Sequence, residues 1–354
     1  MSQSTIVEAS TFVYVGNSDS QDVTVLELLS SGELRPIASV AVPGPSKPGG
    51  SLPIAVAPDK KFLYVGLRNE PYSVASFSIN GKTGILTYIG SVPLADSMAY
   101  ISTDRTGRFL LSASYGGNKV TVNPIGSNGL VGAVQQTVTD VPKAHCIITD
   151  ATNQFVLYTS LGGDRIHQQK FDAKTGMLSP NDPPARHVKV SAGPRHLVFS
   201  PDEKFVFLLN ELDATVHVFP YDASRGTLKE AIQTVPLLPE ELTGKPWAAD
   251  IHLTPDGKFL FASERGSSTL TAFRVATESG RLTRIASYAT AKQPRAFRID
   301  PSGRFLLAVG QLSNSLIIYS IDRSTGTLSE IKTYPVGKNP NWVEIVSFPQ
   351  VSGS

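Results

Sequence analysis

The residues of this chain that are best suited to chemistry stand at two fixed distances from a recurring phenylalanine. Charged residues make up only 18% of its 354 residues, against roughly 25% in an average globular protein. The set comprises His145, Arg195 and Arg295, ten residues before a phenylalanine, and Arg68, Glu211 and Arg265, six residues after one. Arginine suits the forked binding of a carboxylate or phosphate, and histidine or glutamate can take a proton from water. Such a set predicts an anion-binding site with a candidate general base.

The recurring phenylalanine belongs to a repeat that runs along the whole chain. A strand-like run begins with it at intervals of 46 to 54 residues, and a Gly-x-Leu pattern keeps the same spacing. The runs begin at Phe12, Phe62, Phe109, Phe155, Phe205, Phe259 and Phe305. Alternating apolar segments between the two signals are typical of strands. Seven units of about 49 residues, each with four strands, predict an all-β fold: a seven-bladed β-propeller with four-stranded blades.

The two ends of the chain are expected to meet in the first blade. Six of the phenylalanine runs follow an apolar innermost strand, whereas the run at Phe12 has no such predecessor. The chain ends instead with an apolar segment at 342–348, WVEIVSF, that lacks a partner of its own. We expect this C-terminal strand to close the first blade, so that residues 1–354 form a single domain.

Propeller geometry places the candidate residues on one face. A hairpin joins the innermost strand of a blade to the next strand, so the first strand starts where the second ends. The two fixed distances mark these strand ends, close to the central axis. Tyr115 and Gln311 share this register, and Asp250 and His252 follow a start position at Ala249. We therefore expect an arginine-rich funnel; the alternative is a rim of hydrated charges that tie the blades together.

Composition excludes several classes of protein. The chain has 32 basic and 30 acidic residues, a net charge of +2, which argues against a broad nucleic-acid-binding surface. No apolar run approaches the ~18 residues of a membrane span, and residues 1–10 lack the pattern of a signal peptide, so we expect a cytoplasmic protein. The histidines lack metal-ligand spacing. Cys146 is expected to be buried and structural, and packing is expected to account for Trp247 and Trp342.

Four segments resemble a known family. GPRHLVFSPD at 193–202, NEL at 210–212, PWAADIHLTPDG at 246–257 and QPRAFRID at 293–300 are similar to the propeller-type 6-phosphogluconolactonases of bacteria. The resemblance extends over all seven predicted blades. One departure is the proline- and glycine-rich stretch at 43–53, PGPSKPGGSLP, which borders the predicted funnel and could alter substrate preference.

The resemblance also implies an activity and a set of site residues. The superfamily includes the fungal 3-carboxy-cis,cis-muconate lactonizing enzyme, to whose site a His–Arg–Glu–Arg set is attributed. The matching catalytic candidates here are His145, Arg195, Glu211 and Arg265. The candidates for substrate binding are Arg68, Tyr115, His196, Asp250, His252, Arg295 and Gln311. The implied reaction is hydrolysis of 6-phospho-D-glucono-1,5-lactone to 6-phosphogluconate in the oxidative pentose phosphate pathway, with no metal or cofactor.

Lactone hydrolysis needs an activated water, a group that stabilises the oxyanion and an anchor for the phosphate. A histidine among arginines should have a lowered pKa and stay neutral, so His145 is the preferred base and Glu211 its orienting partner or the second ligand of the water. The reverse assignment stays open.

The sequence leaves two alternative functions: a lactonase or cycloisomerase for a carboxylate substrate, such as a carboxymuconate, and a non-catalytic scaffold. The expected partner is a small anionic sugar lactone, with neither nucleic acid nor membrane, and the expected state is a monomer or weak homo-oligomer.

Overall fold

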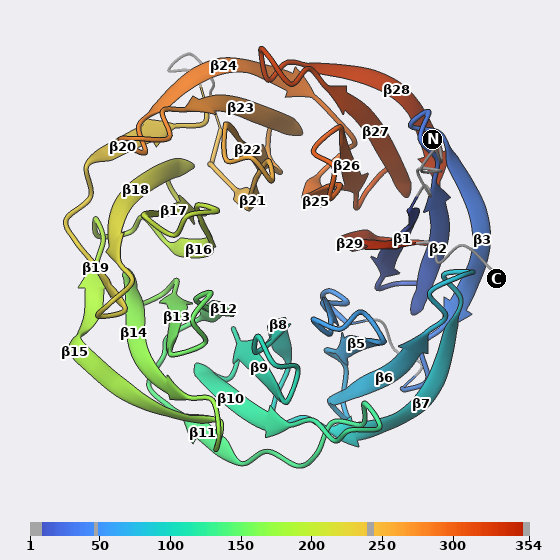
Figure 1. Cartoon of the computed structure of the whole chain (residues 1–354), viewed down its shortest axis with the longest axis horizontal. Helices are drawn as coiled ribbons and strands as arrows, with labels where there is room; N and C mark the ends of the chain where they lie inside the picture. The colour runs from blue at the N-terminus through green and yellow to red at the C-terminus, as the bar shows by residue number, and fades with distance from the viewer. Residues whose placement is uncertain (1–8, 46–48, 239–243, 350–354) are drawn as a thin grey trace, which may run out of the picture.

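The computed structural model describes residues 9–45, 49–238 and 244–349, and these form seven antiparallel sheets arranged as blades around a central axis (Figure 1). The described residues contain strands and turns and no helix, hence no helix that could span a membrane. The predicted seven-bladed β-propeller is confirmed. Six blades have four strands; in the fifth blade two short segments together take the place of the outermost strand.

The strands fall into four concentric positions. The innermost strands are β29 (Pro340–Phe348), β4 (Ile54–Val56), β8 (Met98–Thr103), β12 (Ala144–Thr149), β16 (Pro194–Phe199), β21 (Ala248–Leu253) and β25 (Pro294–Ile299). The second strands are β1 (Ser10–Asn17), β5 (Phe62–Leu67), β9 (Phe109–Ser114), β13 (Phe155–Ser160), β17 (Phe205–Asn210), β22 (Phe259–Glu264) and β26 (Phe305–Gly310). The third strands are β2 (Asp22–Leu28), β6 (Ser73–Ile79), β10 (Lys119–Pro124), β14 (Arg165–Asp172), β18 (Thr215–Asp222), β23 (Thr269–Val275) and β27 (Ser315–Ile321). The outer strands are β3 (Leu34–Ala41), β7 (Leu86–Pro93), β11 (Gln136–Val138), β15 (Met177–His187), β19 (Thr227–Leu228) with β20 (Gln233–Pro236), β24 (Leu282–Ala289) and β28 (Leu328–Pro335).

The first blade is closed from the C-terminal end of the chain, as the sequence predicts. Strand β29 pairs antiparallel with β1, with Phe12 opposite Val346 and Val15 opposite Val343. In Figure 1 the red β29 lies beside the blue β1. Because the remaining three strands of this blade come from the N-terminal part of the chain, the closure joins the two ends of the sequence in one sheet and completes the ring.

The two repeated sequence signals meet at the interfaces between blades. Each glycine of the Gly-x-Leu pattern adopts a positive φ and lies against the phenylalanine of the preceding blade. A Cβ added to Gly84 would lie 2.4 Å from the ring of Phe12, and one added to Gly280 would lie 2.5 Å from the ring of Phe205. The apolar core accordingly consists of seven clusters, each between two adjacent blades. The repeat is therefore the sequence pattern of blade packing.

We expect Gly280→Ala to destabilise the protein by about 1–3 kcal/mol, because alanine is strained at positive φ and its methyl group would collide with Phe205. Gly280 has a φ of +69°. The matched control is Gly116→Ala, since a Cβ at Gly116 would meet nothing within 4 Å. Denaturant unfolding curves of both variants test this expectation, and equal midpoints would contradict the packing role of the glycine.

Candidate active site

Irregularities in the innermost strands position the candidate side chains. The pairing register shifts near the start of six of these strands, between Met98 and Tyr100, Ala144 and Ile147, Pro194 and His196, Ala248 and Ile251, Pro294 and Ala296, and Pro340 and Trp342. A bulge leaves a residue unpaired and turns its side chain out of the regular alternation. His145, Arg195 and Arg295 all lie within these shifts. The bulges thus set the direction of the side chains at the start positions.

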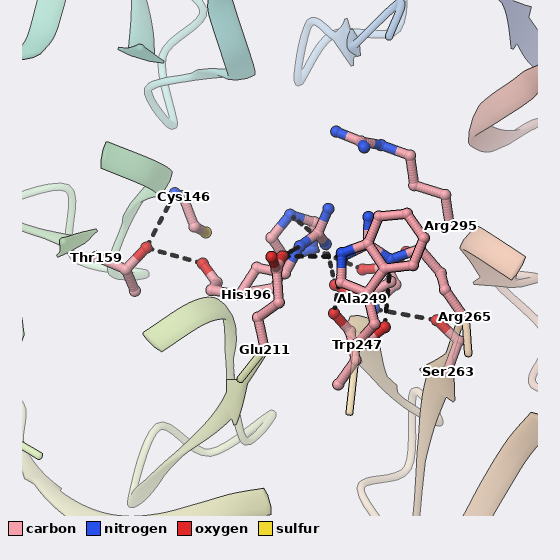
Figure 2. Close-up of polar contacts among 12 residues, drawn as sticks. Cys146, Thr159, His196, Glu211, Trp247, Ala249, Ser263, Arg265 and Arg295 are labelled. Atoms are coloured by element: carbon pink, nitrogen blue, oxygen red, sulfur yellow. Dashed lines mark hydrogen bonds and ion pairs between the residues drawn. The ribbon is translucent and has the colours of Figure 1, made fainter. Parts of the chain in front are cut away.

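Glu211 holds two arginines from neighbouring blades. Its Oε2 accepts a hydrogen bond from Nε of Arg195 at 2.8 Å and another from Nη2 of Arg265 at 2.9 Å. Arg195 is 1% exposed, Arg265 4% and Glu211 8%. Burial alone would raise the pKa of Glu211, but the charges of Arg195 and Arg265 bring this pKa below its ordinary value. The carboxylate is therefore ionised and joins the fifth and sixth blades (Figure 2).

Each of these two arginines keeps one nitrogen without a hydrogen-bond partner among the described residues. Arg195 uses Nη1 for the backbone carbonyl of Ala249 and for Nε2 of His196 at 3.3 Å, which leaves Nη2. Arg265 uses Nε for the carbonyl of Trp247 at 3.3 Å and Nη2 for Ala248 at 3.2 Å, which leaves Nη1. The fixed guanidinium groups thus retain donors that can bind an anion or an oxyanion.

A second pair of arginines has no carboxylate partner among the described residues. Arg68 donates to the hydroxyl of Ser51 from Nη1 at 2.8 Å and to that of Ser97 from Nε at 3.1 Å. Arg295 reaches the same Ser51 hydroxyl from Nη2 at 3.5 Å. Burial, followed by repulsion from Arg195, lowers the pKa of both Arg68 and Arg295. In Figure 2 no dashed line joins Arg295 to the other residues drawn. Because no carboxylate of the described residues pairs with these two charges, the two arginines can bind an anion from outside the protein.

His145 is buried beside the arginines and is neutral. It is 4% exposed, and its Nδ1 has no hydrogen-bond partner among the described residues. Burial, and then the charge of Arg195, holds the pKa of His145 well below its ordinary value. The ring lies edge-on to Tyr115 and to His196, at centroid distances of 6.0 and 5.1 Å. The predicted lowering of the pKa is therefore found, with burial as its larger cause, and no hydrogen bond joins His145 to Glu211 within the described chain.

Trp247 belongs to the site, although packing alone was expected to explain it. Its side chain is 40% exposed, and the guanidinium carbon of Arg265 lies 3.9 Å from its ring centroid. Figure 2 shows Trp247 and Arg265 side by side next to Glu211. Ser51 is a second residue that the sequence analysis missed. It lies in the stretch 43–53, of which residues 46–48 are outside the described residues, and this stretch does border the arginines.

Three predicted substrate-binding residues line a cavity whose wall does not include the clustered arginines. His196, Asp250 and His252 bind one another and face a cavity of about 510 Å³ along the central axis. Its wall continues to Pro58, Arg105 and Pro301, which lie in the turns after the innermost strands, at the opposite end from the arginines. The side chains of His196, Asp250 and His252 therefore lie deeper along the central axis than the arginine cluster.

Gln311 and Cys146 lie apart from the candidate chemistry. Gln311 exchanges amide hydrogen bonds with Gln293 and Asn339, at 3.1 and 2.8 Å, and lies in a surface depression lined by Asp19 and Lys338 rather than among the arginines. Cys146 is fully buried, and burial raises the pKa of its thiol to about 12. Among the described residues, no three histidine, cysteine, aspartate or glutamate side chains are arranged so that they could hold a metal ion.

Known proteins resemble this chain over most of its length. The model of a family described as "Lactonase, 7-bladed beta-propeller" matches residues 12–345. The 6-phosphogluconolactonases of Serratia proteamaculans and Pectobacterium carotovorum are 39% and 40% identical over 288 residues, or 81% of this chain and 84% of each relative. The solved structure of the periplasmic gluconolactonase of Pseudomonas aeruginosa has a TM-score of 0.87 and 26% identity, covering 96% of this chain and 99% of that one. The chain therefore belongs to the lactonase family of seven-bladed β-propellers.

Proposed function

We propose that the protein is a 6-phosphogluconolactonase, which hydrolyses 6-phospho-D-glucono-1,5-lactone to 6-phosphogluconate in the oxidative pentose phosphate pathway. The observation that carries this proposal is a cluster of four arginines beside a neutral histidine, in which Arg195 and Arg265 share one carboxylate while Arg68 and Arg295 have none. The excess of positive charge suits a dianionic substrate, and His145 supplies a group that can accept a proton. The names of the relatives in Serratia and Pectobacterium support the same substrate.

The proposed reaction begins with attack of water on C1 of the lactone. His145 takes the proton of the water as the negative charge moves onto the carbonyl oxygen. Nη2 of Arg195 and Nη1 of Arg265 are the donors available to that oxygen, and fixed donors at a developing charge are an effective source of rate enhancement. Collapse of the intermediate breaks the bond from C1 to the ring oxygen, which takes the proton back from protonated His145 and becomes the C5 hydroxyl. The carboxylic acid formed at C1 releases its proton to solvent and becomes the carboxylate of 6-phosphogluconate.

The most direct test is an assay of lactone hydrolysis on freshly generated 6-phosphogluconolactone, with the spontaneous opening subtracted. Turnover well above the spontaneous rate is the expected result. Absence of turnover would favour one of the two alternatives, a lactonase or cycloisomerase for a carboxylate substrate or a non-catalytic scaffold. A carboxylate-bearing lactone is the second candidate because forked guanidinium groups bind carboxylate and phosphate alike.

We assign the phosphate to Arg68 and Arg295, because neither has a carboxylate partner among the described residues and Ser51 holds both. Arg295→Gln should lower kcat/KM for the phosphorylated lactone by about 10- to 150-fold, the equivalent of a charge-assisted contact of about 1.5–3 kcal/mol. Hydrolysis of unphosphorylated glucono-1,5-lactone should be nearly unchanged. Equal losses on both lactones would show that Arg295 does not bind the phosphate.

Activity should survive exhaustive treatment with EDTA. The side chains that converge on the site are mainly arginines, which repel a cation, and no three potential ligand side chains of the described residues are arranged to hold a metal ion. The check is the hydrolysis rate before and after chelation. Loss of the rate, with recovery on addition of calcium or zinc, would contradict the proposed mechanism.

We propose that the 354 residues form one domain, that the protein works in the cytoplasm where sugar phosphates are made, and that it is a monomer or weak homo-oligomer with no nucleic-acid or membrane partner. Light scattering on the purified protein and fractionation of its host cell would test these statements.

A further inference from the structure

Behind the arginine cluster, one buried carboxylate holds two histidines. Asp250 is 6% exposed. Its Oδ1 lies 2.8 Å from Nδ1 of His196, and its Oδ2 lies 3.1 Å from Nε2 of His252. The backbone N–H groups of Ile251 and Phe297 donate to the same two oxygens, at 3.0 and 3.2 Å. Four donors therefore surround the carboxylate, and such surroundings keep a buried carboxylate ionised.

Two arginines determine where the protons of these histidines are. Nε2 of His196 lies 3.3 Å from Nη1 of Arg195, and Nδ1 of His252 lies 3.4 Å from Nη1 of Arg298. A guanidinium can only donate, so each of these ring nitrogens must be the acceptor. The other nitrogen of each ring then carries the proton and donates it to Asp250. The contacts thus assign one defined tautomer to the neutral form of each ring.

The electrostatic surroundings of His196 favour the same state. The charged and titratable groups that face it are Arg195 on its own strand β16, Asp250 and His252 on β21, His145 on β12 and Tyr100 on β8, and the ring of Trp342 on β29 adds an apolar edge. Burial, and then Arg195, lowers the pKa of His196 to about 4, although Asp250 opposes this change. His196 therefore stays neutral over the whole neutral range.

This arrangement holds a side chain rather than moving a proton. A relay to the site would need His196 to pass a proton to Arg195, which cannot accept one. The contact instead uses one of the two N–H donors of Arg195 Nη1. Nη1 also donates to the carbonyl of Ala249, and Nε donates to Glu211. Nη2 is then the part of the guanidinium that is left for a ligand. Three partners, on β16, on β21 and directly after the end of β17, fix the direction of the guanidinium.

A second arm anchors Asp250 to the strand that closes the ring. Arg298, which contacts His252, donates from Nη2 to Glu344 at 2.6 Å. The indole N–H of Trp342 donates to the other oxygen of Glu344 at 3.1 Å. The chain of contacts thus runs from Arg195 through β16, β21 and β25 to β29. It connects the position of one arginine to the closure of the propeller.

We propose that His196 and Asp250 are positioning residues, which act through Arg195 by fixing the direction of its free Nη2 toward the reacting carbonyl. This assignment replaces substrate binding as their role, and it rests on the proposed function for the reaction that Arg195 serves. His196→Leu should then lower kcat by about 10- to 100-fold, the usual effect of removing an outer partner of an active-site group. KM should change far less, because the phosphate anchors Arg68 and Arg295 are untouched.

A double-mutant cycle with Arg195→Ala separates this role from general damage. If His196 acts through Arg195, His196→Leu should cause no further loss of kcat once Arg195 is alanine. Additive losses would overturn the proposal, and they are what direct substrate binding predicts. His196→Gln should recover part of the activity, since its amide can accept from Arg195 and donate to Asp250. The matched control is His217→Leu on β18 of the same blade, which removes a histidine of the same 6% exposure and should leave kcat unchanged.

A measurement that does not depend on turnover completes the test. In a hydrogen–nitrogen NMR spectrum of the wild-type protein at neutral pH, His196 should show a neutral ring protonated at Nδ1. The Nη1–H signals of Arg195, one of which is donated to His196, should exchange slowly with solvent in the wild type and in His196→Gln, and rapidly in His196→Leu. A protonated or Nε2-protonated His196, or slow exchange in all three proteins, would overturn the proposal even if the lactone is not the substrate.

Discussion

Arg195→Ala should lower kcat/KM for 6-phosphogluconolactone by about 10²–10³-fold, the usual effect of removing one donor to a developing oxyanion. Arg195 is 1% exposed and held by Glu211, His196 and the carbonyl of Ala249. Its free Nη2 therefore points in a fixed direction before the substrate arrives. The loss should fall mainly on kcat, since the donor stabilises the transition state more than the ground state.

Two further variants make this expectation specific. Arg195→Lys keeps the charge, but an ammonium group cannot reproduce the contacts of the planar guanidinium with Glu211, His196 and Ala249. Its activity should therefore be little higher than that of Arg195→Ala. Arg225→Ala changes an arginine in the hairpin turn between β18 and β19, far out in the fifth blade, and should have no comparable effect. Steady-state kinetics of the three variants check this. Similar losses in Arg195→Ala and Arg225→Ala would show that the site is not at the arginine cluster.

The fold was predictable because the residues that form the repeated patterns contact one another between adjacent blades. The phenylalanine and the Gly-x-Leu pattern meet at the interfaces between blades, as Gly84 and Phe12 do, so their spacing measures the size of a blade. The closing strand was equally predictable from the sequence. The backbone N–H and C=O groups of an apolar segment such as 342–348 must be hydrogen-bonded when they are buried, and the first blade lacked an innermost strand. Counting from the phenylalanine also predicted that Arg195, Glu211 and Arg265 meet, since the ends of paired strands lie at the same height.

The details of the site were less predictable, for physical reasons. Counting gives the height of a residue along the axis but not the direction of its side chain, which depends on the bulges near the strand starts. Gln311 shares the register of Glu211, yet it turns to Gln293 and Asn339. Ser51 lies in a stretch without a repeat, so no spacing marks its contact with Arg68. Trp247 was interpreted as a packing residue because a sequence does not show that its ring covers an arginine.

The identity of the base can be settled by how two variants respond to pH. If neutral His145 takes the proton of the water, protonation of the ring abolishes activity as the pH falls through its pKa. Because burial and Arg195 lower that pKa well below the ordinary value, the wild-type rate should rise through one ionisation in the acid range and be level at neutral pH. His145→Asn should lose this step and about 10²–10⁴-fold in kcat, the usual contribution of a general base.

Glu211→Gln should give a different profile if His145 is the base. Loss of the negative charge beside the arginines should move the ionisation of His145 to still lower pH, and the step itself should remain. Turnover should fall less than in His145→Asn, since a glutamine oxygen can still accept from Arg195 and Arg265. If Glu211 is the base instead, through its Oε1, which neither arginine contacts, Glu211→Gln should be the less active protein and His145→Asn should still titrate. Both profiles require subtraction of the spontaneous opening at every pH, because that reaction accelerates toward alkali and would imitate a basic limb.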